Sequence, residues 1–123
     1  MPIHIDVFHP NRIVVIVARG TITPEDATAA IREFLEKGAV QYRKIIDVSM
    51  ASTDLDMERL KAIIALVRSD TRALPRGPLA FVVDKDRNEW ARTFAEMTEA
   101  ERPVKVFTSL HLARRWLDEN SRI

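Results

Sequence analysis

Two strands are predicted by the apolar and polar pattern at the start of the chain. In residues 3–8, IHIDVF, the apolar side chains of Ile3, Ile5 and Val7 alternate with polar ones, which is the pattern of a half-buried strand. Residues 12–20, RIVVIVARG, are almost continuous in β-branched side chains, as in a strand that is covered on both faces. Because only the turn sequence HPN separates them, we expect the two strands to pair as a hairpin.

A helix with clear end signals follows the hairpin. Thr23 is a favoured N-cap residue, Pro24 suits the first helical position, and Gly38 is suited to end the helix. The apolar side chains between these ends fall at helical spacing and are Ala27, Ala30, Ile31 and Phe34. This segment therefore predicts an amphipathic helix that packs one face on the sheet.

Strand-like and helix-like patterns then alternate to the end of the chain. The predicted strands are YRKIIDV, which we expect to end near Asp47, then LAFVVD and VKVF. The predicted helices carry inward-facing stripes, formed by Leu60, Ile63, Ile64 and Val67, by Trp90, Phe94 and Met97, and by Leu110, Ala113 and Leu117. The order β-β-α-β-α-β-α-β-α predicts one α/β domain over residues 1–123. Its sheet is mixed but mostly parallel, with an N-terminal antiparallel hairpin and helices packed on it.

Composition narrows the class of protein further. The chain has 123 residues, 46% of them apolar and 30% charged, with a net charge of +1. This balance is typical of a soluble globular domain and offers no strong field for nucleic acid. The absence of cysteine excludes thiol chemistry, and no apolar run is long enough to span a membrane. We expect a cytoplasmic, bacterial-type protein that binds no nucleic acid.

Polar side chains gather where two of the predicted strands end, which is where open α/β sheets bind ligands. After one strand come Asp47, Ser49, Ser52, Thr53, Asp54 and Asp56, and after the next come Asp84 and Asp86. Helix capping explains these residue types simply, with Thr53 or Asp54 as the cap of the second helix and Asp86 with Glu89 as a capping-box-like pair. The alternative is that the two acidic loops lie side by side and bind a divalent cation. The segment DKDRNE lacks the glycine and distal glutamate of a calcium loop, and no nucleophile or phosphate-loop motif is present.

Two further features remain open between a structural and a binding role. Trp90, Phe94 and Met97 form an inward stripe that belongs to a core or lines an apolar pocket, and the same choice applies to Trp116 with Leu117. Several arginines, Arg68, Arg72 and Arg76 with Arg114 and Arg115, lie near helix ends or in the last helix. They neutralise negative helix termini or form an anion or docking patch.

These patterns resemble a known family. The element order, the strand end IIDVS and the closing VKVFTSLHLARRWLDE resemble the STAS domain of SpoIIAA-type anti-sigma-factor antagonists and the short bacterial SpoIIAA-like proteins. In the phosphorylated antagonists, Asp-Ser-Ser-Gly stands at the start of the second helix. Here the corresponding residues 55–58 read LDME, so Asp56 or Met57 replaces the phosphoacceptor serine. We therefore expect a permanently charged cap or docking surface in place of a switch, and Ser49, Ser52 and Thr53 remain open as phosphate acceptors.

The resemblance and the residues together favour a non-enzymatic regulatory or binding domain. We expect another protein to dock on residues 47–56, on the start of the second helix and on the Asp84–Asp86 loop, with no cofactor. A first alternative is a carrier of a small apolar or lipid-like ligand, because lipid-carrier domains of the CRAL-TRIO type resemble this fold. A second is a divalent-metal-dependent enzyme that uses Asp47 and Asp84. A homodimer through the edge of the first strand is a further expectation.

Overall fold

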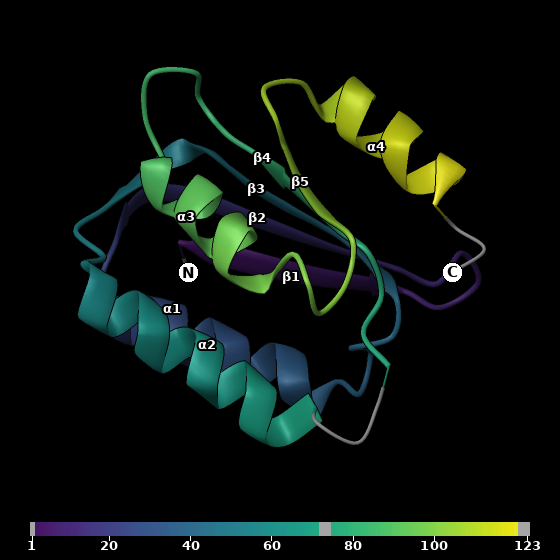
Figure 1. Cartoon of the computed structure of the whole chain (residues 1–123), viewed down its shortest axis with the longest axis horizontal. Helices are drawn as coiled ribbons and strands as arrows, with labels where there is room; N and C mark the ends of the chain where they lie inside the picture. The colour runs from purple at the N-terminus through teal and green to yellow at the C-terminus, as the bar shows by residue number, and fades with distance from the viewer. Residues whose placement is uncertain (1, 72–74, 121–123) are drawn as a thin grey trace.

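The order of helices and strands in the computed structural model follows the prediction (Figure 1). The structure describes residues 2–71 and 75–120. Its elements are β1 (Ile3–Phe8), β2 (Ile13–Ile22), α1 (Pro24–Glu36), β3 (Arg43–Thr53), α2 (Met57–Thr71), β4 (Leu79–Val82), α3 (Glu89–Thr98), β5 (Val104–Phe107) and α4 (Leu110–Glu119). No helix within the described residues combines the length and the apolar character that a bilayer crossing requires.

The strands form one five-stranded sheet in the order β1-β2-β3-β4-β5. β1 pairs antiparallel with β2, from Ile3 opposite Ala18 to Phe8 opposite Ile13. The remaining neighbours are parallel, because a helix connects each of those strands to the next. The predicted mixed sheet with its N-terminal hairpin is confirmed.

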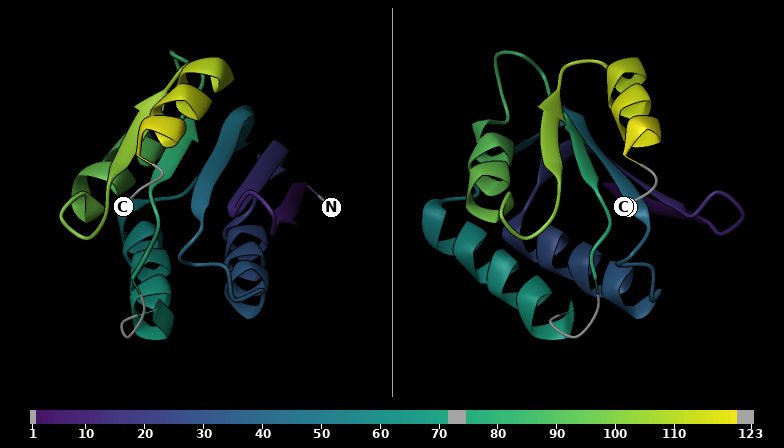
Figure 2. Two further views of the ribbon diagram at one scale, coloured as in Figure 1. Left: turned by 90° about the vertical axis from the view of Figure 1, so that its right-hand side faces the viewer. Right: turned by 45° about the vertical axis from the view of Figure 1, so that its right-hand side comes forward.

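The helices are divided between the two faces of the sheet. Since each crossover leads to the next strand in the same direction, right-handed connections place α1, α2 and α3 on one face, and α4 covers the other (Figure 2). The larger core lies beneath α1–α3 and includes Leu60, Ile64, Phe81, Ala91 and Phe94. The smaller core lies beneath α4 and joins Ile45, Ala80, Val82, Ala113 and Leu117.

The end signals of α1 operate as the sequence indicates. The Thr23 hydroxyl accepts a hydrogen bond from the Asp26 N–H at 3.0 Å, and the Asp26 carboxylate accepts one from the Thr23 N–H at 3.1 Å. This capping box satisfies backbone donors of the first turn that would otherwise lack partners. Gly38 follows the helix at a φ of +67°, a left-handed conformation that glycine adopts without strain.

The third strand is longer than predicted. We expected it to end near Asp47, but β3 continues to Thr53 and stays paired with β2 along that extension. A bulge separates the pair Val17–Asp47 from the pair Arg19–Met50, and the Asp47 carboxylate accepts hydrogen bonds there from the Ser49 N–H and hydroxyl. Small polar residues that suggested a loop are therefore the residues of a bulged strand.

Candidate functional site

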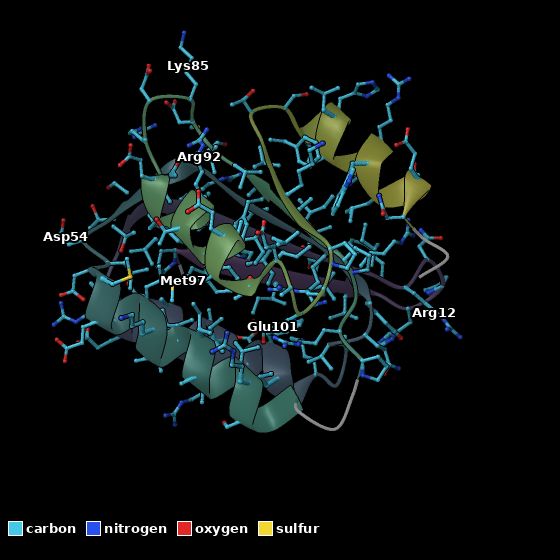
Figure 3. The ribbon with its side chains drawn as sticks, in the orientation of Figure 1. Arg12, Asp54, Lys85, Arg92, Met97 and Glu101 are labelled. Atoms are coloured by element: carbon cyan, nitrogen blue, oxygen red, sulfur yellow. The ribbon has the colours of Figure 1, made fainter. Side chains whose placement is uncertain are left out.

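The loop surface, defined as residues 47–57 together with residues 84–88, lies at the carboxyl ends of β3 and β4. The pairing between β3 and β4 stops at Asp47 opposite Val82, so the two chain segments separate beyond that point. The labelled residues Asp54 and Lys85 mark the two segments in Figure 3. This is the edge at which open α/β sheets bind ligands.

The hydroxyl groups that the sequence left open as phosphate acceptors differ in their surroundings. Ser49 donates its hydroxyl hydrogen bond to Asp47 at 2.7 Å, and Thr53 donates to the carbonyl of Ile22 at 2.7 Å. Ser52 is exposed. Of the three side chains, Ser52 is thus the one that faces solvent without a structural hydrogen bond among the described residues.

Asp56 caps the second helix. Its carboxylate accepts a hydrogen bond from the backbone N–H of Arg59 at 2.8 Å, and its charge lies at the positive end of α2. The prediction that Thr53 or Asp54 provides this cap is wrong, because Thr53 belongs to β3 and α2 begins later, at Met57. Asp56 thus provides a fixed negative charge at the helix start.

The β4–α3 segment is ordered by its own side chains. The Asp84 carboxylate accepts a hydrogen bond from the Asp86 N–H at 2.9 Å and lies 3.5 Å from the Arg87 guanidinium. This backbone hydrogen bond, helped by Arg87, holds the pKa of Asp84 below its ordinary value. The predicted capping-box pair of Asp86 and Glu89 is wrong, since the residue preceding α3 is Asn88.

Asn88 joins the two halves of the loop surface. Its buried side chain donates to the carbonyl of Ala51 at 3.1 Å and accepts from the N–H of Asp84 at 3.1 Å. Its backbone has a φ of 65°, a left-handed conformation that asparagine tolerates better than most residues. Arg87 adds a second link, from its guanidinium to the carbonyl of Ser49 at 3.2 Å. Sequence reasoning missed Asn88, although an asparagine directly before a helix is itself a turn signal.

The loop surface also carries exposed apolar side chains. Met50 is 67% exposed at the bulge of β3, and Met57 is 50% exposed at the start of α2. Methionine is flexible and polarizable and is common at binding surfaces. The same segments carry five aspartates against Lys85 and Arg87, so the loop surface combines exposed methionine side chains with a net negative charge.

A metal site finds no support in this arrangement. Among the side chains that the structure describes, those of residues 2–69 and 75–120, no group of three or more His, Cys, Asp or Glu is placed to hold a metal ion. Asp47 and Asp84, which the metal hypothesis named as ligands, instead accept hydrogen bonds from their own loops.

A cavity of about 110 Å³ lies between the sheet and the helices α1–α3. The residues of its wall are apolar except for Thr53 and Asn88. The apolar stripe predicted for α1 forms one side of it, and the aromatic rings of Phe81, Phe94 and Trp90 form another. The cavity ends at the loop surface, because Ala51, Thr53, Leu55 and Asn88 contribute to both.

Trp90, whose ring lines the cavity, also carries an unusual buried polar group. Within the described residues, its Nε1 is the buried side-chain nitrogen or oxygen that has no hydrogen-bond partner. A buried donor without a partner costs about 1–3 kcal/mol, so such groups are rare and need an explanation.

The residues of the predicted apolar pocket do not all line this cavity. Trp90 and Phe94 line the cavity, whereas Met97 packs against the same core beside it. Trp116 lies on the opposite face of the sheet, where it packs with Phe107 in the core beneath α4. Grouping Trp116 with Trp90 in one pocket is therefore wrong. The separation follows from the sheet itself, because α3 and α4 cover different faces.

The arginines also separate into two groups. Arg68 and Arg76 both donate to the carboxylate of Glu101, which lies beside α2 (Figure 3). Arg114 and Arg115 are exposed on α4, and Arg72 lies outside the described residues. The first group is at the end of the sheet opposite the loop surface.

Fold and site together define a small α/β domain with a mixed five-stranded sheet and an apolar cavity beneath three helices. The family model described as SpoIIAA-like matches residues 13–118, and the chain belongs to this SpoIIAA-like family. Among curated proteins, none matches the chain by sequence.

Two solved structures share the fold. One is an uncharacterised protein of the DUF3478 family with a SpoIIAA-like fold from Shewanella loihica PV-4; it is 16% identical with a TM-score of 0.63, over 94% of this chain and 91% of that one. The other is the anti-sigma factor antagonist SpoIIAA in its unphosphorylated form, 14% identical with a TM-score of 0.58, over 98% and 99% of the two chains. At these identities the likeness shows the fold alone.

Proposed function

We propose that this chain is a non-enzymatic binding domain whose ligand is a small apolar molecule, held in the cavity between the sheet and α1–α3. The observation that carries the proposal is an apolar cavity, lined from both sides by the sheet and by α1–α3, with no charged residue in its wall. An empty cavity of this size costs about 2–3 kcal/mol in lost packing, which a bound molecule restores.

The cavity limits the size and chemistry of the ligand. An apolar cavity of roughly 150 Å³ in another protein binds benzene, so about 110 Å³ suits a single ring or a short branched chain. No residue of the wall carries a charge, and a charged ligand group inside it would remain uncompensated.

Native mass spectrometry of the protein purified from its own host tests this proposal. We expect an added mass on the wild-type chain that Ala51→Leu reduces, because Ala51 lines the cavity and a larger side chain fills it. Ala100→Leu is the matched control, since Ala100 is exposed outside the cavity. A bare wild-type chain that also fails to bind any added small ring compound would overturn the proposal.

A second candidate function, a protein-docking domain, is favoured by the exposed Met50 and Met57 within the acidic loop surface. Its partner would present an apolar side chain with basic neighbours. The test is capture from the host's lysate, followed by a binding measurement with the purified captured protein. We expect Met50→Ser to weaken that complex about tenfold, which is the effect of losing a central apolar contact. Arg114→Ser, which changes an exposed residue of α4, should leave the affinity unchanged. Equal affinities for the two variants would refute docking at this surface.

A further inference from the structure

Four basic side chains form a cation cluster at the amino ends of the parallel strands. Lys44 is near the start of β3, Arg76 precedes β4 and Arg102 precedes β5, so three neighbouring strands each bring one cation to this end of the sheet. Arg68 joins them from the last turns of α2. Glu101 is the carboxylate among them and accepts hydrogen bonds from Arg68 and Arg76.

Two of these cations are buried, which makes the cluster unlike an ordinary charged surface. Lys44 is 6% exposed and Arg102 is 7% exposed. Buried cations normally have a carboxylate partner of their own, yet no described carboxylate is paired with either residue. The cluster carries surplus positive charge. Burial is the main cause that lowers the pKa of Lys44 to about 7, and the charges of Arg102 and Arg76 lower it further.

The neutral partners of Lys44 and Arg102 leave donors available. Lys44 donates from Nζ to the carbonyls of Tyr42 at 2.8 Å and Gly77 at 3.1 Å, so a protonated amine retains one N–H. Arg102 donates to the carbonyl of Thr98 at 3.2 Å and makes no other side-chain hydrogen bond with the described residues. Its guanidinium carbon lies 5.7 Å from the centroid of the Phe94 ring.

The backbone around the cluster is closely fitted. A side-chain carbon at Gly77 would lie 2.2 Å from the carbonyl oxygen of Tyr42, so glycine lets the segment before β4 lie against residues 40–42. The Gly77 N–H donates to the carbonyl of Val40 at 3.0 Å. This contact places the carbonyls of Tyr42 and Gly77 around the same amine, and it fixes the position of Lys44.

We propose that Lys44, Arg76 and Arg102 form a binding site for a phosphate group. In the structure Glu101 contacts Arg76 and Arg68, and its single charge neutralises only part of the charge of the cluster. A phosphate dianion matches the surplus better than a single carboxylate, and its oxygens accept from more of the available donors than Glu101 does. Arg76 and Glu101 remain partly exposed, with side chains 15% and 21% accessible, so a phosphate reaches the site by displacing Glu101.

Titrations at constant ionic strength, followed by amide chemical shifts, test this site. The probes are inorganic phosphate and methyl phosphate, with acetate as the monovalent comparison. We expect saturable shifts at residues 76–77 and 101–102 with the phosphates and weaker binding of acetate. Glu101→Gln should tighten phosphate binding about tenfold and Arg76→Gln should weaken it by a similar factor, because each changes one charge at the site. Tighter binding of methyl phosphate than of inorganic phosphate would identify an ester as the ligand, and the reverse would identify the free ion.

Matched controls separate a site from a general charge effect. Arg114→Gln removes an exposed cation from α4, on the other face of the sheet, and should leave phosphate affinity unchanged. A loss of binding in Arg102→Gln would not distinguish a lost contact from misfolding. The deciding variant is therefore Glu101→Gln, because a gain of affinity requires a folded protein. Absence of saturable shifts in both wild type and Glu101→Gln would overturn it, as would equal affinities in Arg76→Gln and Arg114→Gln. The cations would then serve the carbonyl ends of α2 and α3 alone.

Discussion

Replacing Lys44 with methionine should remove a pH dependence from the stability of this domain. Burial, with Arg102 and Arg76 nearby, lowers the pKa of Lys44 to about 7, whereas a lysine in an unfolded chain has a pKa of about 10.4. Between these two values the unfolded chain binds more protons at this residue than the folded protein does, so the free energy of unfolding rises with pH. Integrating the difference from pH 7 to pH 9 gives a rise of about 2 kcal/mol.

Urea unfolding at pH 7, 8 and 9 measures this rise directly. Lys44→Met should lose it, while Lys61→Met, which removes an exposed lysine of α2, should keep it. The comparison uses the change with pH because methionine also leaves the carbonyls of Tyr42 and Gly77 without a donor. A wild-type stability that does not rise over this range, or a rise that persists in Lys44→Met, would refute the electrostatic reasoning.

Three further predictions concern the loop surface and the cation cluster. Asp56→Ala should lower the free energy of unfolding by about 1 kcal/mol in urea melts, and Asp56→Ser should not, because serine also caps a helix. Asn88→Gly keeps the left-handed backbone but loses both side-chain hydrogen bonds. It should lower the free energy of unfolding by about 2 kcal/mol and speed hydrogen exchange in the β4–α3 loop. Unchanged exchange would contradict this prediction. Arg68, through its hydrogen bond, and Arg76 hold the pKa of Glu101 at about 2. Wild type should therefore lose about 1–2 kcal/mol of stability as the pH falls from about 4.5 towards 2, solvent screening included, and Glu101→Gln should not; equal acid sensitivity would contradict this.

The fold was predictable because local signals and the global pattern agree in this chain. The capping box of α1 rests on residues that are adjacent in sequence, Thr23 and Asp26, and the structure shows both of its hydrogen bonds. The hairpin and the β-α alternation follow from periodicity, which needs no knowledge of tertiary contacts. A mostly parallel sheet then follows from the helical connections between its strands.

The candidate site was predictable only in part, because its geometry depends on contacts between distant residues. Asp47 and Ser49 suggested a loop, but pairing with β2 keeps this segment in the strand and converts it into a bulge. The periodicity of α3 and α4 shows that Trp90 and Trp116 face inward, yet it does not say which face of the sheet each helix covers. Lys44 is a charged residue at the start of β3, and its burial involves the segment around Gly77, 33 residues along the chain.

The most direct test of the ligand-binding proposal is an NMR titration of the labelled protein with cyclohexanone, a small ring with one carbonyl. The two tryptophans give two indole N–H signals, and they lie on opposite faces of the sheet, so Trp116 serves as an internal control. The account predicts a saturable shift of the Trp90 indole signal and of the amides around the cavity, while the Trp116 signal stays in place. No saturable shift at Trp90, or equal shifts of both indole signals, would contradict the proposal that the cavity is a ligand site.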